Sequence, residues 1–281
     1  MIARVFPRRT QATPTDPLTF IGDPPLFIPD GITEVRVSVA FTWDLPVARM
    51  LADSWARIAP VQVGGPALGL PGGDFESGQY LRHGYTITSR GCPNRCWFCS
   101  VPKREGTIRE LSIHDGWNVL DDNLLACSDG HITDVFAMLA RQPKRPQFTG
   151  GLEPKRITRD VAAALVKLHP ESIFLAYDTP DDWDHVKRAA EVLKEAGQHF
   201  AGHRVRCYVL IGFPSDTFEK AETRLRAVLE TGIFPAAMLW RDDGGQFKPE
   251  WRAFQRRWFR PALIAKLAGP LDGEPNQEIE R

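Results

Sequence analysis

From residue 85 onward, strand-like and helix-like patterns alternate along the chain. Short runs of β-branched and aromatic residues predict strands, and apolar residues at helical spacing lie between them. The predicted strands span residues 85–88, 117–120, 147–149, 173–177, 206–211 and 236–239. Repeated alternation is typical of a parallel sheet with helices outside it. We therefore expect an α/β fold, an incomplete (β/α)6 barrel, although a doubly wound open sheet fits the same pattern.

Local signals mark where the helices of this region begin and end. Thr158 is an expected N-cap, Thr179-Pro180 places a cap before a proline at the first helical position, and Gly197 ends that helix. Another helix is predicted from about residue 217 to residue 230. The interval from Cys99 to the second strand is too short for a metal loop plus a full crossover helix, so that helix is expected to be very short or absent.

The N-terminal part has a different pattern. Residues 1–33 are rich in proline, which predicts an extended arm without regular structure. A strand at residues 35–40, a helix at 45–58 and a strand at 61–63 follow, which makes one β-α-β unit. The Gly/Pro-rich stretch from residue 64 to residue 78 is interpreted as a linker.

These patterns divide the chain into three parts. Residues 1–80 form the arm and the small β-α-β unit, and residues 81–245 form the core. Residues 246–281 are expected to contain a C-terminal helix at 251–267 and a mobile tail.

Composition excludes several classes of protein. Apolar residues make up 43% and charged residues 25%, as in ordinary globular proteins. The formal net charge of zero gives no indication of nucleic acid or of an anionic membrane as a partner. Neither a long apolar run nor the apolar segment of a signal peptide is found. We expect a cytoplasmic protein without a membrane partner, in which five cysteines serve metal binding or burial.

Three cysteines are spaced C-x3-C-x2-C directly after the first predicted strand of the core, in the segment SRGCPNRCWFCSVPKREG. Cys92, Cys96 and Cys99 are therefore the candidate metal ligands. Cubane iron–sulfur clusters usually take four thiolates, so three would leave one iron with an open site. The alternative is a structural zinc site completed by His83 or His114.

This segment resembles the cluster loop of the radical S-adenosylmethionine superfamily, which has the same spacing and an aromatic residue before the third cysteine, here Phe98. The resemblance covers residues 85–241. It implies a [4Fe-4S] cluster whose open iron chelates S-adenosylmethionine, and a 5′-deoxyadenosyl radical formed by its reductive cleavage that acts on an unknown substrate. It also implies an electron donor of the flavodoxin or ferredoxin type. No catalytic residue is assigned.

The resemblance also implies cofactor contacts at the carboxyl ends of the core strands. With Phe98, the residues placed there are Asp122, Asn123, Gly150, Gly151, Glu153, Tyr177, Asp178, Gly212 and Pro214. Asp122 stands where the family often has a Gly-Gly-Glu motif that binds the amino group of S-adenosylmethionine, so the chain departs from the family there. Simpler interpretations as turn, loop or helix-start residues exist for Asp122, Gly150, Gly151, Asp178, Gly212 and Pro214.

Two branches of the superfamily are similar in part. The unit at residues 35–67 resembles the second half of a cobalamin-binding domain, but the Asp-x-His-x-x-Gly ligand motif is absent, so no cobalamin is expected. The methylthiotransferase branch has a similar SRGCPN loop and usually an additional N-terminal three-cysteine site, whereas this chain has no cysteine before Cys92.

A second class of function competes with the enzyme. The arginine-rich segment at residues 251–267, with Trp251 and Trp258, also suits a nucleic-acid- or protein-binding module with a structural metal. A helix of this kind more often covers the side of a domain.

Overall fold

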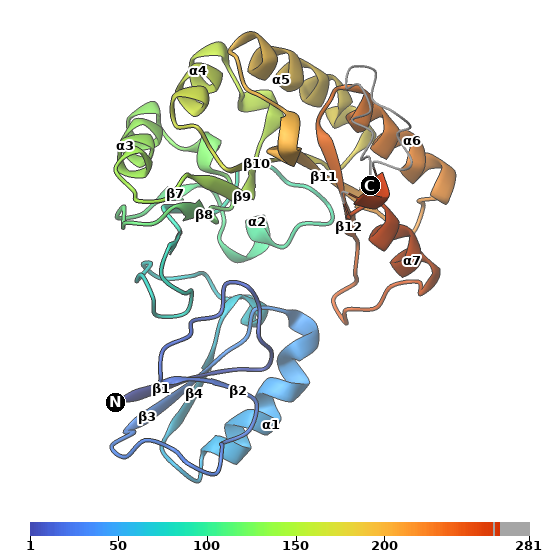
Figure 1. The fold of residues 1–281 in the computed structure, drawn as a ribbon. Helices are drawn as coiled ribbons and strands as arrows, with labels where there is room; N and C mark the ends of the chain where they lie inside the picture. The colour runs from blue at the N-terminus through green and yellow to red at the C-terminus, as the bar shows by residue number, and fades with distance from the viewer. Residues whose placement is uncertain (261, 265–281) are drawn as a thin grey trace, which may run out of the picture.

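Two parallel sheets organise the computed structural model, which describes residues 1–260 and 262–264 (Figure 1). The larger sheet has six strands in the order β12-β11-β10-β9-β8-β5, and all neighbours are parallel. Its strands are β5 (Tyr85–Thr86), β8 (Asn118–Val119), β9 (Gln147–Leu152), β10 (Ser172–Tyr177), β11 (Val205–Ile211) and β12 (Phe234–Leu239). Each begins within two residues of its predicted start. Because β5 and β12 stand at opposite edges, the strands of the described chain form an open α/β sheet and not a closed barrel.

Four helices cover one face of this sheet (Figure 1). They are α3 (Asp129–Ala140), α4 (Arg159–Lys167), α5 (Trp183–Glu195) and α6 (Phe218–Glu230). The predicted caps are confirmed: the Thr158 hydroxyl accepts the Val161 N–H, and Gly197 takes a positive φ after α5. Short 3-10 helices span Thr42–Asp44, Pro66–Leu68, Leu124–Ala126, Pro154–Arg156, Pro180–Asp182 and Ala201–His203.

The core of the larger unit lies between the sheet and these helices. Phe148, Leu165, Ile173 and Leu193 are fully buried there. Such burial is the main stabilising contribution to a fold of this kind. Trp258, which follows α7 (Glu250–Arg257), joins the same core, and its carbonyl accepts the Ala237 N–H of β12.

The smaller sheet has four parallel strands in the order β2-β1-β3-β4. They are β1 (Ile2–Phe6), β2 (Thr19–Ile21), β3 (Glu34–Ser38) and β4 (Val61–Gly64). The expectation that residues 1–33 lack regular structure is wrong. The prolines lie outside the two short strands, and Val5 of β1 is buried against the helix layer, so tertiary burial outweighs local composition.

Helix α1 (Leu45–Trp55) covers one face of the smaller sheet. Trp55 is fully buried, and its indole N–H donates to the Gly22 carbonyl at 3.0 Å. The other face meets the irregular segment at residues 69–82, where Arg4 of β1 donates to the Gly78 and Gln79 carbonyls. The predicted linker therefore packs on the sheet, and its first residue, Gly64, belongs to β4.

A short antiparallel hairpin, β6 (Ser89–Arg90) and β7 (Arg109–Glu110), follows β5 and encloses the cysteine segment. Within it, α2 (Val101–Arg104) is a single helical turn. The prediction of a very short first helix is confirmed.

The predicted C-terminal helix is described only in part. Helix α7 ends at Arg257, residues 262–264 are helical again, and residues 265–267 lie outside the described residues, as does the expected tail. In the part of the chain that the structure describes, no helix is long and apolar enough to cross a membrane.

Candidate functional site

The hairpin β6–β7 holds the three cysteines on one closed loop. The Cys92 N–H donates to the Gly106 carbonyl and the Cys99 N–H to the Cys96 carbonyl. Gly91 has a φ of +88°, and a Cβ there would lie 2.2 Å from the Thr107 carbonyl oxygen. Glycine is therefore required where the loop leaves β6.

The thiols of this loop are half-buried and free. Burial, followed by the negative charge of Asp178, raises the pKa of the Cys96 thiol to about 11, and burial raises the pKa of Cys99. Thiolates are the metal-binding form, and a bound cation deprotonates thiols of this kind. The donor set therefore fits a positively charged metal centre, which would supply the charge that the surroundings lack.

Among the described residues, no three His, Cys, Asp or Glu side chains stand together as a metal-binding group, and this holds for the three cysteines too. The two histidines considered for a zinc site make other contacts. His114 packs against Phe75 with ring centroids 6.1 Å apart, and the His83 ring lies against Gly78.

Asn123 and Glu153, two of the predicted residues, lie together against the cysteine loop. The Asn123 amide donates to the Cys92 Sγ at 3.3 Å and to the Glu153 carboxylate at 2.8 Å. The same carboxylate accepts from Asn94 at 2.9 Å, Lys155 at 2.7 Å and Arg156 at 2.6 Å.

These contacts determine the charge of Glu153. Burial alone would raise its pKa, but the hydrogen bonds from its neighbours outweigh that effect and lower the pKa to about 2. Glu153 is thus ionised at neutral pH, and it ties the cysteine loop to the end of β9. Asn94 was not among the predicted residues, although its position between two cysteines was a signal.

The pair Asp121 and Asp122 divides into two roles. Asp121 is buried and accepts the Thr88 N–H, the Thr88 hydroxyl and the Ser89 hydroxyl, so it fixes the chain between β5 and β6. Asp122 accepts the Gly91 N–H at 2.9 Å and lies 3.8 Å from Arg104. Burial raises the pKa of Asp122. Its carboxylate lies at the base of the cysteine loop, where it was predicted to bind a ligand.

Gly150 and Gly151 lie inside β9 and not after it, because β9 continues to Leu152 through a shift in register against β10. A Cβ at Gly150 would lie 2.6 Å from the Asp121 carbonyl oxygen, and Gly151 has a φ of +94°. The predicted strand end at residue 149 is wrong, since the glycines permit a bulge that the apolar pattern did not indicate. Gly150 thus lets β9 approach the end of β8.

At the end of β10, Tyr177 and Asp178 face different surroundings. Tyr177 is buried in the core, with its ring 5.7 Å from that of Trp183, so its side chain serves packing. The Asp178 Oδ1 is buried and has no hydrogen-bond partner among the described residues. Burial, together with the charge of Asp182, raises the pKa of Asp178 to about 7. An orphaned carboxylate oxygen at a strand end beside the cysteine loop fits a ligand group that donates a hydrogen bond.

Phe98 and the loop after β11 belong to an aromatic group. Trp97 lies 5.5 Å from Phe98, 5.8 Å from Phe213 and 6.4 Å from Trp240, and it is 56% exposed. Pro214 follows Phe213 in this loop. The residues at 97, 213 and 240 were not among the predicted ones, although an exposed tryptophan between two cysteines is a signal for binding.

Gly212 fixes the start of that loop. It has a φ of +74°, a Cβ there would lie 2.8 Å from Leu239, and its N–H donates to the Asp216 carboxylate at 2.9 Å. Asp216 in turn forms a buried ion pair with Arg224 of α6 at 2.8 Å.

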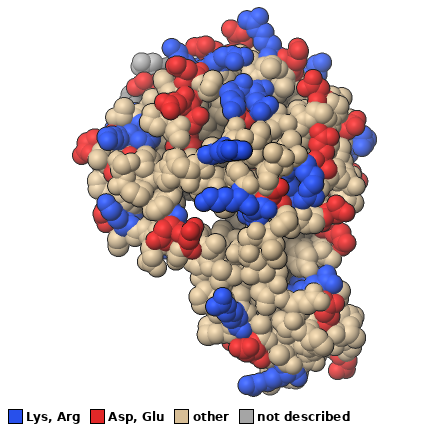
Figure 2. Space-filling view, turned by 180° about the vertical axis from the view of Figure 1, so that it is seen from behind, with Lys and Arg blue, Asp and Glu red and all other residues tan. Residues whose placement is uncertain are grey.

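Charge is unevenly distributed over the surface despite the net charge of zero. Figure 2 shows Lys and Arg side chains gathered across the middle of the face seen from behind. A nucleic-acid partner, considered from the sequence, stays a prediction.

The chain has a distant similarity to a curated protein. No family model matches the chain. It is 25% identical over 189 residues to the ribosomal protein uS12 methylthiotransferase RimO of Thermotoga sp. (strain RQ2). The match covers 56% of this chain and 43% of that protein. The chain thus spans less than half the length of the curated relative it matches. This distant similarity supports the radical S-adenosylmethionine superfamily and does not extend to a reaction or a substrate.

Proposed function

We propose that this chain is a radical S-adenosylmethionine enzyme in which Cys92, Cys96 and Cys99 hold a [4Fe-4S] cluster. The observation that carries the proposal is the closed cysteine loop at the carboxyl edge of a parallel sheet, tied to the neighbouring strand ends by Asn123 and Glu153. Ligand sites of parallel α/β proteins lie at this edge. The distant similarity to a methylthiotransferase points in the same direction.

When bound, the cluster and S-adenosylmethionine supply a 5′-deoxyadenosyl radical for an unknown substrate. The chain's own residues bind and orient the cofactor. Asp122 would accept a hydrogen bond from its amino group, and the Asp178 Oδ1, which has no partner among the described residues, would accept one from its ribose. The loop at Gly212 and Pro214, together with the ring of Phe98, would hold its adenine side. A donor of the flavodoxin or ferredoxin type provides the electron. The core at residues 81–245 acts as a partial barrel around the site.

Anaerobic reconstitution followed by iron and sulfide analysis tests the cluster. We expect about four irons per chain, and no cluster in the Cys96→Ala variant. Cys127→Ala is the matched control, because Cys127 is a buried cysteine outside the loop. A cluster retained by Cys96→Ala, or one zinc per chain in place of iron, contradicts the proposal.

Cleavage of the cofactor tests the chemistry. A dithionite-reduced sample should convert S-adenosylmethionine to 5′-deoxyadenosine, measured by chromatography. Asp122→Ala and Asp178→Asn should weaken binding of S-adenosylmethionine while the iron content stays at the parent level. A fully loaded protein that binds the cofactor yet releases none of this product, even with cell extract as the substrate source, contradicts the radical mechanism.

A further inference from the structure

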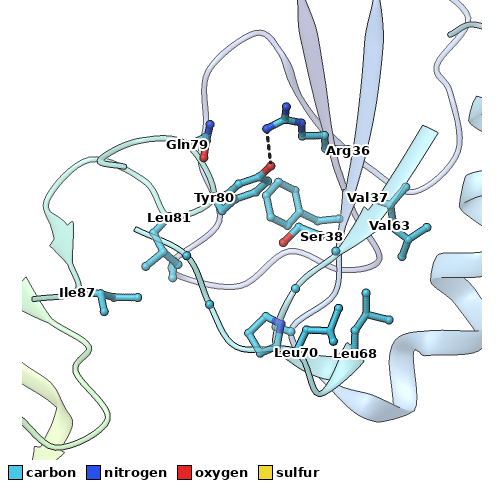
Figure 3. A pocket seen from close by; sticks show the side chains of 18 of the residues that line it. Arg36, Val37, Ser38, Val63, Leu68, Leu70, Gln79, Tyr80, Leu81 and Ile87 are labelled. Carbon is cyan, nitrogen blue, oxygen red and sulfur yellow. Dashed lines mark hydrogen bonds between the residues drawn. The ribbon is translucent and has the colours of Figure 1, made fainter. Parts of the chain in front are cut away.

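The smaller sheet has a cavity of about 600 Å³ on the face opposite α1 (Figure 3). Side chains alternate along a strand, so Arg36 and Ser38 of β3 point away from the core that contains Val35 and Val37. Irregular chain at residues 69–82 covers this face where a helix would pack in a two-sided parallel sheet. The cavity lies between that chain and the strands.

The position of the cavity follows from the order of the strands. The chain passes from β1 to β2 on one side and returns to β3 on the other, so the direction of winding reverses between β1 and β3. In open α/β sheets, ligands bind outside the carboxyl ends of the strands at this reversal. Phe6 and Ser38, the last residues of β1 and β3, both line the cavity.

The walls are apolar and aromatic. Figure 3 shows Tyr80 and Leu81 on one side of the cavity and Leu68 and Leu70 on another. A volume of this size accommodates a small organic ligand with most of its surface buried.

The polar groups of the lining are paired arginines, free neutral side chains and two exposed carboxylates. The carboxylates, Asp74 and Glu76, have no ion-pair partner among the described residues, and their charge disfavours an anionic ligand. The arginines are already paired: Arg8 with Asp44, Arg36 with Glu34 and the Tyr80 hydroxyl, and Arg90 with the Gly73 carbonyl. The side chains of Ser38, Gln62 and Gln79 make no hydrogen bond within residues 1–260 and 262–264. These neutral donors and acceptors suit an uncharged polar ligand and not a phosphate, which binds at free cationic groups or a helix N-terminus.

We propose that this cavity binds an uncharged, planar heteroaromatic molecule of nucleoside size. Its ring stacks on Tyr80, and its polar edge meets Ser38, Gln62 and Gln79. The site is separate from the proposed cofactor site and needs no iron–sulfur cluster.

One carboxylate connects this cavity to the cysteine loop. Glu105 lines the cavity with a side chain only 1% exposed, and it accepts the Gly72 N–H at 2.9 Å and an Arg104 N–H at 2.9 Å. Arg104 reaches Asp122, which holds the Gly91 N–H. A bound ligand should therefore slow amide exchange at residues 70–81 first and at the cysteine loop second.

Equilibrium dialysis of the full chain against adenosine, guanosine, cytidine, uridine and riboflavin tests the proposal, with AMP and inorganic phosphate as charged probes. We expect at least one uncharged probe to bind at submillimolar concentration. Tyr80→Ala should weaken that binding about tenfold or more, while Tyr80→Phe, which keeps the ring, should change it less than about threefold. Ser38→Trp should fill the cavity and abolish binding. Phe27→Ala is the control, because Phe27 is 86% exposed in the same unit and does not line the cavity.

Four results would overturn the proposal: no uncharged probe binds, AMP or phosphate binds more tightly, saturating S-adenosylmethionine displaces the probe, or Tyr80→Ala binds as the parent does. Displacement by S-adenosylmethionine would assign the probe to the cysteine-loop site. A thermal melt of each variant checks that it folds. If Ser38→Trp does not fold, the comparison of Tyr80→Ala with Tyr80→Phe tests the proposal instead. Loss of the cluster in Cys96→Ala must leave probe binding unchanged, which separates this test from that of the proposed function.

Discussion

The two parallel sheets differ in how their second faces are covered. Each has helices on one face, α3 to α6 on the larger sheet and α1 on the smaller (Figure 1). On the other side, the larger sheet has the cysteine loop and α2 near its strand ends, and the smaller has irregular chain over a cavity. Parallel sheets are usually covered on both faces. Both candidate sites lie where the second helical layer is missing.

The chemistry of the two faces also differs. At the larger sheet, carboxylates and amides are engaged with the cysteine loop, and the buried Asp178 Oδ1 and Asn123 Oδ1 have no hydrogen-bond partner among the described residues. At the smaller sheet, Arg8 and Arg36 are paired with carboxylates, whereas the neutral side chains of Ser38, Gln62 and Gln79 have no partner among the described residues. The first arrangement suits a charged cofactor and the second an uncharged ligand.

The largest loss of stability is expected on replacing the buried tryptophan in each of the two cores. Trp55 and Trp258 are both fully buried, so Trp55→Ala and Trp258→Ala should each lower the free energy of unfolding by about 3–5 kcal/mol. Because the two belong to different clusters, each variant should lose hydrogen-exchange protection mainly in its own sheet. Equal loss of protection in both sheets would show a single cooperative unit. Trp55→Phe should lower the free energy of unfolding by about 1 kcal/mol more than Trp258→Phe does. The reason is that the Trp55 indole N–H donates a hydrogen bond, whereas the Trp258 indole N–H has no partner among the described residues.

The buried ion pair beneath the Gly212 loop comes next. Asp216→Ala leaves Arg224 buried without its partner, so the free energy of unfolding should fall by about 3 kcal/mol in a urea titration. Glu222→Ala removes the partner of the exposed Arg226 on the same helix. It should change the free energy of unfolding by less than about 0.5 kcal/mol. Similar losses in both variants would mean that the loop after β11 is not held by the buried pair.

Two glycines at the base of the cysteine loop provide a matched pair. Gly91→Ala places a Cβ against the Thr107 carbonyl and should cost about 2 kcal/mol and reduce iron loading. Gly106 also has a positive φ, but a Cβ there would meet nothing within 4 Å. Gly106→Ala should therefore lower the free energy of unfolding by about 1 kcal/mol and leave iron loading unchanged. Normal loading of Gly91→Ala would show that the loop changes conformation when it binds metal.

The smallest effect is the pH dependence contributed by Glu153. Its pKa in the folded protein is about 2, against an ordinary 4.5, so its anion stabilises the fold above about pH 4.5, and this contribution is lost as the pH falls toward 2. Urea titrations of the metal-free protein between about pH 3 and pH 6 should show a loss of about 1–2 kcal/mol that Glu153→Gln lacks. Glu222→Gln is the exposed control and should follow the parent. An identical pH profile for Glu153→Gln would mean that the hydrogen bonds to this carboxylate do not persist in solution.

Local pattern alone predicted much of the larger sheet and its ligand candidates. The six strands, the Thr158 cap, the stop at Gly197 and the single-turn α2 follow from side-chain periodicity, capping chemistry and chain length, all of which act over a few residues. The three cysteines were identified by their spacing, because ligands within eight residues can meet on one loop without long-range folding.

Only the tertiary structure decided the rest, because it depends on contacts between distant segments. Proline-rich composition concealed β1 and β2, whose pairing and burial need β3. Gly150 was placed after the end of a strand, whereas it lies inside β9, where the Asp121 carbonyl leaves no room for a Cβ. Tyr177 turned into the core, while Asp178, the next residue, kept a buried oxygen without a partner. The cavity at Tyr80 has no sequence signal at all, since it is the space left where a sheet face lacks a helix.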